Sequence, residues 1–400
     1  MFRMTKNGMK QLFTALIVFF LSIAAQAQLH FGDSLRVSLL TVAPGEQTFE
    51  RFGHTGLRVT DLRTGQDVVF HYGVYDYTEP NFIWHFVEGK CNYRMGANYM
   101  RDFLTEHRRR RLDVTEQVLQ LDSAQAKRLV DALVENYKPQ NRNYRYNFFF
   151  DNCATRPFAM LNRCADIQYD TAWVRDVTLR DMVHEKTGIG QWLDFGIALT
   201  VAGRADKRAS FTEQMFLPDY LSRAIGHAEI DGRKLVGETR SYPMGDGAVT
   251  DTGCGLFRPM PIGCLVLAIG LLLTVLAHVN RRDGQRHWPQ KSAQAFDTVW
   301  LLVTGLAGCI VWLLNFFSEH PAVDHNLNCL WLLPTNLLFI TFIWTKRGEK
   351  VRRIYFFIIF AAVILYIMSV CVSAQYCHAA FVPMIATVLL RSAANIASRK

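Results

Sequence analysis

The clearest pattern in the chain is a change in the spacing of apolar residues near residue 260. Residues 28–260 mix apolar and charged positions, whereas the segment that follows alternates long apolar runs with short basic loops. Each run approaches the length of about 20 residues that a helix needs to cross a bilayer. Because the last run is short and directly follows the fourth, we expect a hairpin partner or a re-entrant segment there. The five predicted spanning helices occupy residues 262–279, 298–317, 327–344, 354–372 and, more weakly, 374–390.

Basic residues between these runs predict how the helices are oriented. Lysine and arginine are concentrated in loops 280–297 and 345–353 and in the C-terminal tail, and neither occurs in connections 318–326 and 373–376. Positively charged loops stay on the cytoplasmic side of a membrane. We therefore expect the basic loops and the C-terminus in the cytoplasm, and residues 28–245 on the opposite side.

The N-terminus has the composition of a secretory signal. A positively charged start is followed by an apolar core at residues 12–23 and by Ala25-Gln26-Ala27, which is a small-x-small cleavage pattern. An uncleaved first spanning helix is the alternative, but the core is short for a span. We expect cleavage before Gln28. The predicted organisation is a signal peptide at 1–27, an exported domain at 28–245, a glycine-rich linker at 246–260 and a membrane domain at 261–395.

Within the exported domain, apolar and polar residues alternate with the period of a β-strand in several places. Such strands are predicted around residues 35–39, 55–60, 67–75 and 112–121. Residues 126–137 then carry one apolar stripe at helical spacing, and a proline follows that stripe. Strands followed by helices indicate an α+β fold.

The net charge of +9, from 44 basic and 35 acidic residues, changes this picture little. Many of the basic residues lie in the loops that set topology, and no segment resembles a nucleic-acid-binding module. We expect no nucleic-acid partner. The histidine spacing fits no zinc pattern, so no metal and no cofactor are expected.

Cys153 is the first candidate for chemistry. It follows an aromatic run and precedes a predicted helix, because Asp151 and Asn152 are good caps and Pro157 is tolerated only in a first turn. A thiolate at a helix N-terminus is stabilised by unpaired N–H groups. The alternative is a disulfide or an inert buried thiol, since an exported domain permits disulfides. A pairing of Cys91 with Cys164 would leave Cys153 reduced.

A nucleophilic cysteine needs a base, and His54 is the first candidate. It stands at the start of a predicted strand between Gly53 and Gly56, and glycines permit close approach of a substrate or another segment. His71, on the next predicted strand, would orient the imidazole of His54 if the two strands pair. A histidine in a strand is more often structural than catalytic, so neither residue alone identifies a site.

Taken together, four short motifs resemble the N-terminal periplasmic domain of the Lnb-type family. The C-terminal helices also resemble that family, so the similarity covers most of the mature chain. The resemblance implies a circularly permuted papain-like fold, as in NlpC-type peptidases, in which the histidine precedes the cysteine. The family often has asparagine where this chain has His71, which leaves the third triad member open. The motifs are Phe-Gly-His-Thr at 52–55, His-Tyr-Gly-Val-Tyr-Asp at 71–76, Asn-Phe at 81–82 and Asp-Asn-Cys-Ala-Thr-Arg at 151–156.

The resemblance also implies a function, which is lipoprotein N-acylation. A phospholipid would give its acyl chain to Cys153, and a diacylated lipoprotein would accept it. The implied location is the inner membrane of a Gram-negative bacterium, and Tyr72, Asn152 and Arg156 are expected beside the substrates. A papain-like hydrolase, either a phospholipase or a peptidoglycan amidase, and a non-catalytic membrane scaffold are the alternatives.

Polar residues of the membrane domain form a second candidate cluster. His320, Asn326 and Asn328 lie at or near the connection predicted to face the exported domain, where a lipid headgroup could bind. Interhelical hydrogen bonding is the plainer interpretation for the asparagines, Asn336 included. The basic run at 108–111 permits two interpretations, docking to anionic headgroups or a charged, solvated strand edge.

Overall fold

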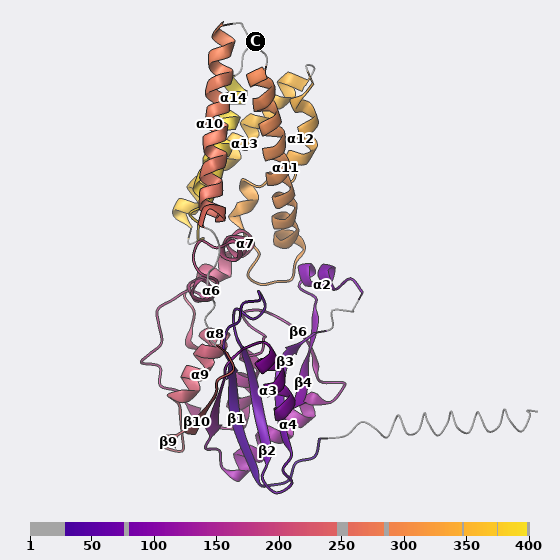
Figure 1. The fold of residues 1–400 in the computed structure, drawn as a ribbon, viewed down its shortest axis with the longest axis vertical. Coiled ribbons are helices and arrows are strands. Elements are labelled where there is room, and N and C mark those ends of the chain that lie inside the picture. The colour runs from indigo at the N-terminus through magenta and orange to yellow at the C-terminus, as the bar shows by residue number, and fades with distance from the viewer. Residues whose placement is uncertain are drawn as a thin grey trace, which may run out of the picture.

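The chain forms two domains that stand end to end, a sheet-containing domain and a helical domain (Figure 1). The structure, a computed structural model, describes residues 29–75, 80–245, 255–283, 288–345, 348–373 and 375–397. The expected signal peptide and most of the expected linker lie outside these residues. The predicted α+β fold followed by a helical domain is confirmed.

The sheet domain is built on a seven-stranded antiparallel sheet with the strand order β10-β5-β1-β2-β3-β4-β6. The four strands predicted from alternation are all present, as β1, β2, β3 and β5. A small three-stranded sheet joins Ile167–Gln168, Glu229–Ile230 and Arg233–Lys234. The bounds of the main strands are Leu35–Val42 (β1), His54–Asp61 (β2), Asp67–Val74 (β3), Asn92–Tyr99 (β4), Val114–Leu119 (β5), Asn143–Arg145 (β6) and Val236–Tyr242 (β10).

Each face of the main sheet packs against helices, because alternate side chains of a strand point to opposite faces. The larger core lies between one face and helices α4 (Ser123–Tyr137), α5 (Thr155–Cys164) and α9 (Pro218–Gly226). Helix α4 begins with a capping box between Asp122 and Gln125. The opposite face packs on α3 (Met100–Arg109) through a small apolar cluster.

Helix α3 corrects one expectation about the basic run at 108–111. Arg108 and Arg109 lie in the last turn of α3, where cations stabilise the helix dipole, and not on a strand edge. Arg110 follows directly and donates to the carboxylate of Glu50 at 2.6 Å. The run therefore ends a helix that the alternation pattern did not reveal.

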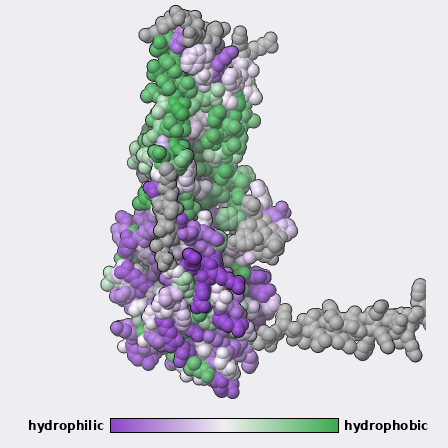
Figure 2. All heavy atoms as spheres, in the orientation of Figure 1, coloured by the Kyte–Doolittle hydropathy of each residue, from purple (hydrophilic) through white to green (hydrophobic). Residues whose placement is uncertain are grey.

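The helical domain contains three described helices that are long and apolar enough to cross a membrane, and a shorter apolar fourth. Figure 2 shows their apolar surface as a column above the polar sheet domain. The long helices are α10 (Pro259–Asp283), α11 (Trp288–Phe317) and α13 (Glu349–Val372), and the shorter helix is α14 (Phe381–Ala397).

The third apolar run is not one spanning helix, and this part of the prediction is wrong. It divides into a 3₁₀ turn, η3 (Leu327–Leu330), and a short helix, α12 (Asn336–Ile343). Pro334 lies in the break and cannot donate a helical hydrogen bond. Gly308 of α11 lets the broken segment approach, because a Cβ there would lie 2.7 Å from the Leu332 carbonyl oxygen.

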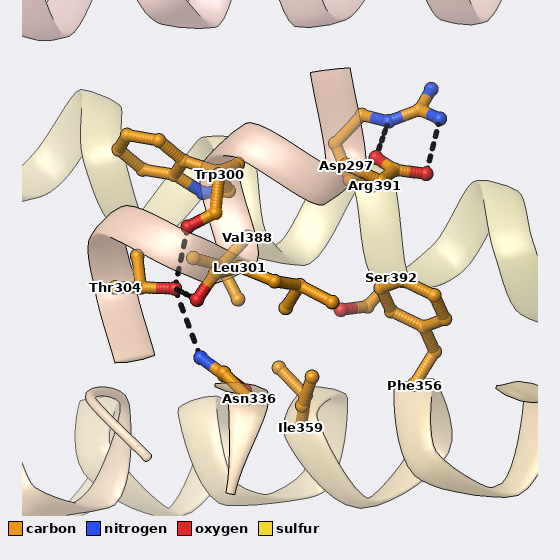
Figure 3. A pocket seen from close by; sticks show the side chains of 10 residues that line it. All are labelled: Asp297, Trp300, Leu301, Thr304, Asn336, Phe356, Ile359, Val388, Arg391 and Ser392. Atoms are coloured by element: carbon orange, nitrogen blue, oxygen red, sulfur yellow. Dashed lines mark hydrogen bonds and ion pairs between the residues drawn. The ribbon is translucent and has the colours of Figure 1, made fainter. Parts of the chain in front are cut away.

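Two clusters of polar groups inside the helical domain are paired, one around Asp297 and Arg391 and one around Thr304 and Asn336 (Figure 3). Arg391, one of the basic residues of the C-terminal tail, is buried in α14 and donates to both carboxylate oxygens of Asp297 at 2.6 and 2.9 Å. Asn336 donates to the Thr304 hydroxyl at 2.9 Å and accepts from the Tyr355 hydroxyl at 2.7 Å. The interhelical interpretation of Asn336 is therefore confirmed.

Candidate active site

Three polar side chains form a track across three neighbouring strands. His54 of β2, His71 of β3 and Asn98 of β4 lie on the sheet face that packs against α3. In the strand register, His71 is paired with Gly56 on one side and with Gly96 on the other. His54 and Asn98 are each two residues from those glycines and therefore point to the same face. The glycines leave room for the rings, since a Cβ at position 96 would lie 3.0 Å from His71 Nε2.

Hydrogen bonds along this track assign a tautomer to each ring. His71 Nε2 lies 2.8 Å from Asn98 Oδ1, and His71 Nδ1 lies 3.1 Å from His54 Nε2. With the carboxamide in this orientation, Asn98 only accepts, so His71 Nε2 carries the proton and its Nδ1 accepts from His54 Nε2. His54 Nδ1 then has a free lone pair, which is the protonation state that a base requires.

Burial keeps both imidazoles neutral at physiological pH. The pKa of His54 lies well below its usual value, first because of burial and then because of the positive charges that His71, His107 and Arg110 carry when protonated. Burial is also the largest cause of the lowered pKa of His71, and the hydrogen bond that His71 donates to Asn98 opposes this lowering. A neutral His54 is able to accept a proton.

Asn152 holds the backbone around Cys153 in place. Its Oδ1 accepts the N–H groups of Ala154 and Thr155, and its Nδ2 donates to the carbonyl oxygens of Phe148 and Phe216 at 2.7 and 2.8 Å. The side chain of Asn152 is buried and fully engaged. Its role in this structure is therefore to shape the turn that presents Cys153.

Cys153 lies directly against the start of β2. Its thiol sulfur accepts a hydrogen bond from the N–H of Thr55, the residue after His54, and its Cβ lies close to Gly73 of β3. This brings Cys153 to the two strands that carry the histidines. The thiol and the His54 ring themselves share no hydrogen bond in the described part of the chain.

The expectation that a helix N-terminus would lower the pKa of Cys153 is wrong. Burial raises the pKa of this thiol to about 11, although the N–H groups of Thr55 and Cys153 itself partly oppose the rise. The free N–H groups at the start of α5 are not available to the sulfur, because Asn152 caps two of them. Cys153 is therefore a neutral thiol at physiological pH.

An apolar wall stands next to Cys153. The ring of Phe148 packs edge-to-face on Phe52 at 4.7 Å between centroids and on Phe216 at 5.6 Å. Phe52 directly precedes the glycine before His54, and Phe148 belongs to the aromatic run before Cys153. Phe52, Phe148 and Cys153 all pack against the core cluster that contains Phe216, and such apolar surroundings disfavour a charged thiolate.

Tyr72 and Arg156, both expected beside substrate, are engaged within the domain. Tyr72 is fully buried, and its hydroxyl donates to Asn136 at 2.7 Å. Arg156 donates to both carboxylate oxygens of Asp151 and lies 3.6 Å above the ring centre of Tyr144. Arg156 thereby braces the start of the helix that follows Cys153, and Tyr72 links β3 to α4.

The polar residues of the membrane domain lie at the junction with the sheet domain. The amides of Asn326 and Asn328 donate to carbonyl oxygens at the end of α7 (Trp192–Thr200) and so cap that helix. His378 accepts the Ala380 N–H and donates to buried Asp194 of α7 at 3.2 Å. These groups dock one domain on the other, and their side chains are buried.

The cysteine pairing expected from the sequence is not formed. Cys91, Cys153 and Cys164 are all free thiols, and Cys91 and Cys164 are buried at different places in the same apolar core. The Cys164 thiol donates to the Arg128 carbonyl oxygen at 3.8 Å. The disulfide on which a scaffold role for Cys153 would rest is therefore absent among these three residues.

Asn98 and Gly96 are the site residues that the sequence alone did not reveal. Neither belongs to the motifs, and β4 was not among the predicted strands. A usable signal exists in the spacing Gly96-x-Asn98, because a glycine two residues from an amide marks a strand face with room for a neighbouring ring. Its use requires the register of β3 against β4, which the sequence does not specify.

Comparison with known proteins adds family identity to this geometry. The sequence model of the Lnb N-terminal periplasmic domain matches residues 25–184, and that of the Lnb transmembrane domain matches residues 251–400. No curated protein and no solved structure matches the chain. The two matches cover most of the chain and identify an inner-membrane protein with a periplasmic N-terminal domain. The chain therefore belongs to the Lnb family.

Proposed function

We propose that this protein is a lipoprotein N-acyltransferase that moves an acyl chain from phospholipid, through a thioester on Cys153, to the α-amino group of a diacylglyceryl-cysteine lipoprotein. The observation that supports this most is the track from Asn98 through His71 to His54, which ends beside Cys153. In this proposal Cys153 is the nucleophile and His54 the base. His71 orients His54, as a third triad member does.

The first half-reaction forms the thioester. His54 Nδ1 takes the proton from the Cys153 thiol as the sulfur attacks the ester carbonyl of the phospholipid. The carbon–sulfur bond forms and the ester carbon–oxygen bond breaks. The departing lysophospholipid oxygen takes the proton from His54. Because both groups start neutral, proton transfer accompanies attack, and no preformed ion pair is needed.

The second half-reaction uses the lipoprotein. An α-amino group has a pKa of about 8, so a large fraction is neutral and nucleophilic near physiological pH. The nitrogen attacks the thioester, the carbon–nitrogen bond forms and the carbon–sulfur bond breaks. His54 carries the amine proton to the departing sulfur, which restores the neutral pair.

The apolar surroundings favour transfer over hydrolysis. Water that reached the thioester would release a free fatty acid and make the enzyme a phospholipase. We propose that the wall of Phe52, Phe148 and Phe216, which belongs to the core on which Cys153 packs, limits that access. Both proposed substrates are anchored in the outer leaflet of the inner membrane, and the sheet domain is seated on the membrane helices on that side.

The residues expected to bind substrate divide into two groups. Tyr72, Asn152, Asn326 and Asn328 are buried and hydrogen-bonded within the protein, so we propose that they act by shaping the site and the domain junction. Arg156 and His320 keep partly exposed side chains, and these remain our candidates for the headgroup phosphate.

Mass spectrometry of lipoprotein N-termini tests this proposal. Cells that contain the protein should carry N-acylated, triacylated lipoproteins, and cells without it should carry diacylated forms. Purified protein given phospholipid alone should acquire an acyl group on Cys153 that hydroxylamine releases. Release of free fatty acid without transfer to an amine would instead favour the hydrolase.

A further inference from the structure

Helix α2 (Phe82–Glu88) is an apolar element that the chemistry above does not use. Its sequence is Phe-Ile-Trp-His-Phe-Val-Glu, and the helix lies where the sheet domain meets the end of α11 (Figure 1). Trp84 and Phe86 are 51% and 49% exposed, although aromatic side chains are normally covered. Residues two apart in a helix point about 200° from each other, so aromatic rings face outward on two sides.

This arrangement does not fit a helix on a water-facing surface. A surface helix has one apolar stripe and one polar face, whereas a helix that is apolar on all sides belongs in an apolar medium. The polar residues of α2, His85 and Glu88, pair with each other at 3.7 Å near its C-terminal end. The remaining side chains of α2 are apolar.

The C-terminal end of α2 is fastened to the membrane domain. The Glu319 N–H donates to the Glu88 carbonyl oxygen at 2.9 Å, and His320 Nε2 donates to the Phe86 carbonyl oxygen at 2.8 Å. Gly89 permits this approach, since a Cβ there would lie 2.9 Å from the backbone nitrogen of His320. Glu319 also forms ion pairs with Lys90 and Arg145. The position of α2 relative to the membrane helices is therefore defined.

The aromatic surface of α2 continues onto the membrane helix next to it. Phe316 and Phe317, in the last turn of α11, are 60% and 72% exposed. A spanning helix of this kind meets the headgroup region at its end, and aromatic residues are enriched at that level. The charged cluster around Glu319 lies beside these rings, as expected at the boundary between acyl chains and headgroups.

We propose that α2 is immersed in the periplasmic leaflet of the membrane, with Trp84 and Phe86 in contact with phospholipid acyl chains at the headgroup boundary. The occupant of this surface is lipid, and not a second copy of the chain or a protein partner. The inference does not depend on the reaction at Cys153.

Photo-cross-linking of the full-length protein in phospholipid vesicles tests this proposal. The photoreactive residue p-benzoylphenylalanine is incorporated at position 84 or 86, and the vesicles contain a phospholipid with a fluorescent headgroup. Leu62 is the matched control site, because it is 52% exposed but lies in the turn at the far end of β2. All three proteins are purified as folded, membrane-inserted species and compared at equal amounts.

We expect lipid adducts at positions 84 and 86 on the order of tenfold more often than at position 62. Lipid labelling at the level of the Leu62 control would overturn the proposal. A covalent dimer formed from position 84 or 86 in place of lipid adducts would also overturn it, since the surface would then bind a second copy.

Discussion

Removal of the Asn98 carboxamide should slow acylation of Cys153. Without it, His71 is no longer held in the tautomer that leaves His54 Nδ1 free to accept a proton. In Asn98→Ala, His71 Nε2 loses its acceptor at 2.8 Å, and either ring nitrogen of His71 is then free to carry the proton. When His54 takes the thiol proton, the developing positive charge spreads toward His71. A hydrogen bond to a charged group contributes about 1.5–3 kcal/mol. Loss of about 1.5 kcal/mol from the transition state lowers the rate about tenfold.

The assay for this prediction is single-turnover acylation of Cys153 from phospholipid, with the acyl group released by hydroxylamine. Asn98→Asp supplies a carboxylate acceptor, so it should retain most of the rate. The added negative charge stabilises the protonated imidazoles, raises the pKa of the histidine pair and moves the acid limb of the rate to higher pH. Tyr99→Ala is the matched control, because Tyr99 is the exposed next residue of β4. A normal rate and pH profile in Asn98→Ala would refute the tautomer reasoning.

Three further predictions concern the glycine beside His71, the pKa of His54 and the orientation of the membrane helices. Gly96→Ala should lower the acylation rate by about tenfold while the protein stays folded, because its Cβ would lie 2.7 Å from Val74 Cγ2 and 3.0 Å from His71 Nε2 and would displace the His71 ring; acylation rates and a melting curve of the variant measure this. The acid limb of the rate should lie below pH 6.5, since the lowered pKa of His54 keeps the base neutral there; a limb above pH 6.5 would contradict burial as the cause. Engineered cysteines in loop 345–353 should resist an impermeant thiol reagent in intact spheroplasts, and labelling there would overturn the predicted orientation.

The sequence predicted the parts of the fold that depend on local patterns. Strands β2 and β3 follow from their alternation, and α4 follows from its apolar stripe and the proline after it. Helix α2 was missed because a seven-residue segment with five apolar residues is too short to show a diagnostic period. The break in the third apolar run was missed although Pro334 was evident, because tertiary contacts at Gly308 decide whether such a run bends or spans.

The site residues that lie within sequence motifs were predictable. The residue that joins the site only through the register of neighbouring strands was not. His54, His71 and Cys153 were named from short motifs, and their catalytic roles stay a prediction. Asn98 joins them only through the pairing of β3 with β4. The predicted direction of the Cys153 pKa shift was wrong. The sequence shows a capping residue and a helix start, but it shows neither the aromatic wall nor that the Asn152 side chain already binds the N–H groups at that helix start.

The central claim is that Cys153 and His54 form one catalytic unit whose product is an N-acylated lipoprotein. The most direct test is mass spectrometry of lipoprotein N-termini from cells that carry the Cys153→Ala variant, with His54→Ala and the double variant beside it. Each single change should abolish N-acylation while the protein stays in the membrane, and the double change should add little, because either loss disables the same step. Triacylated lipoproteins at the normal level in the Cys153→Ala cells would contradict the account.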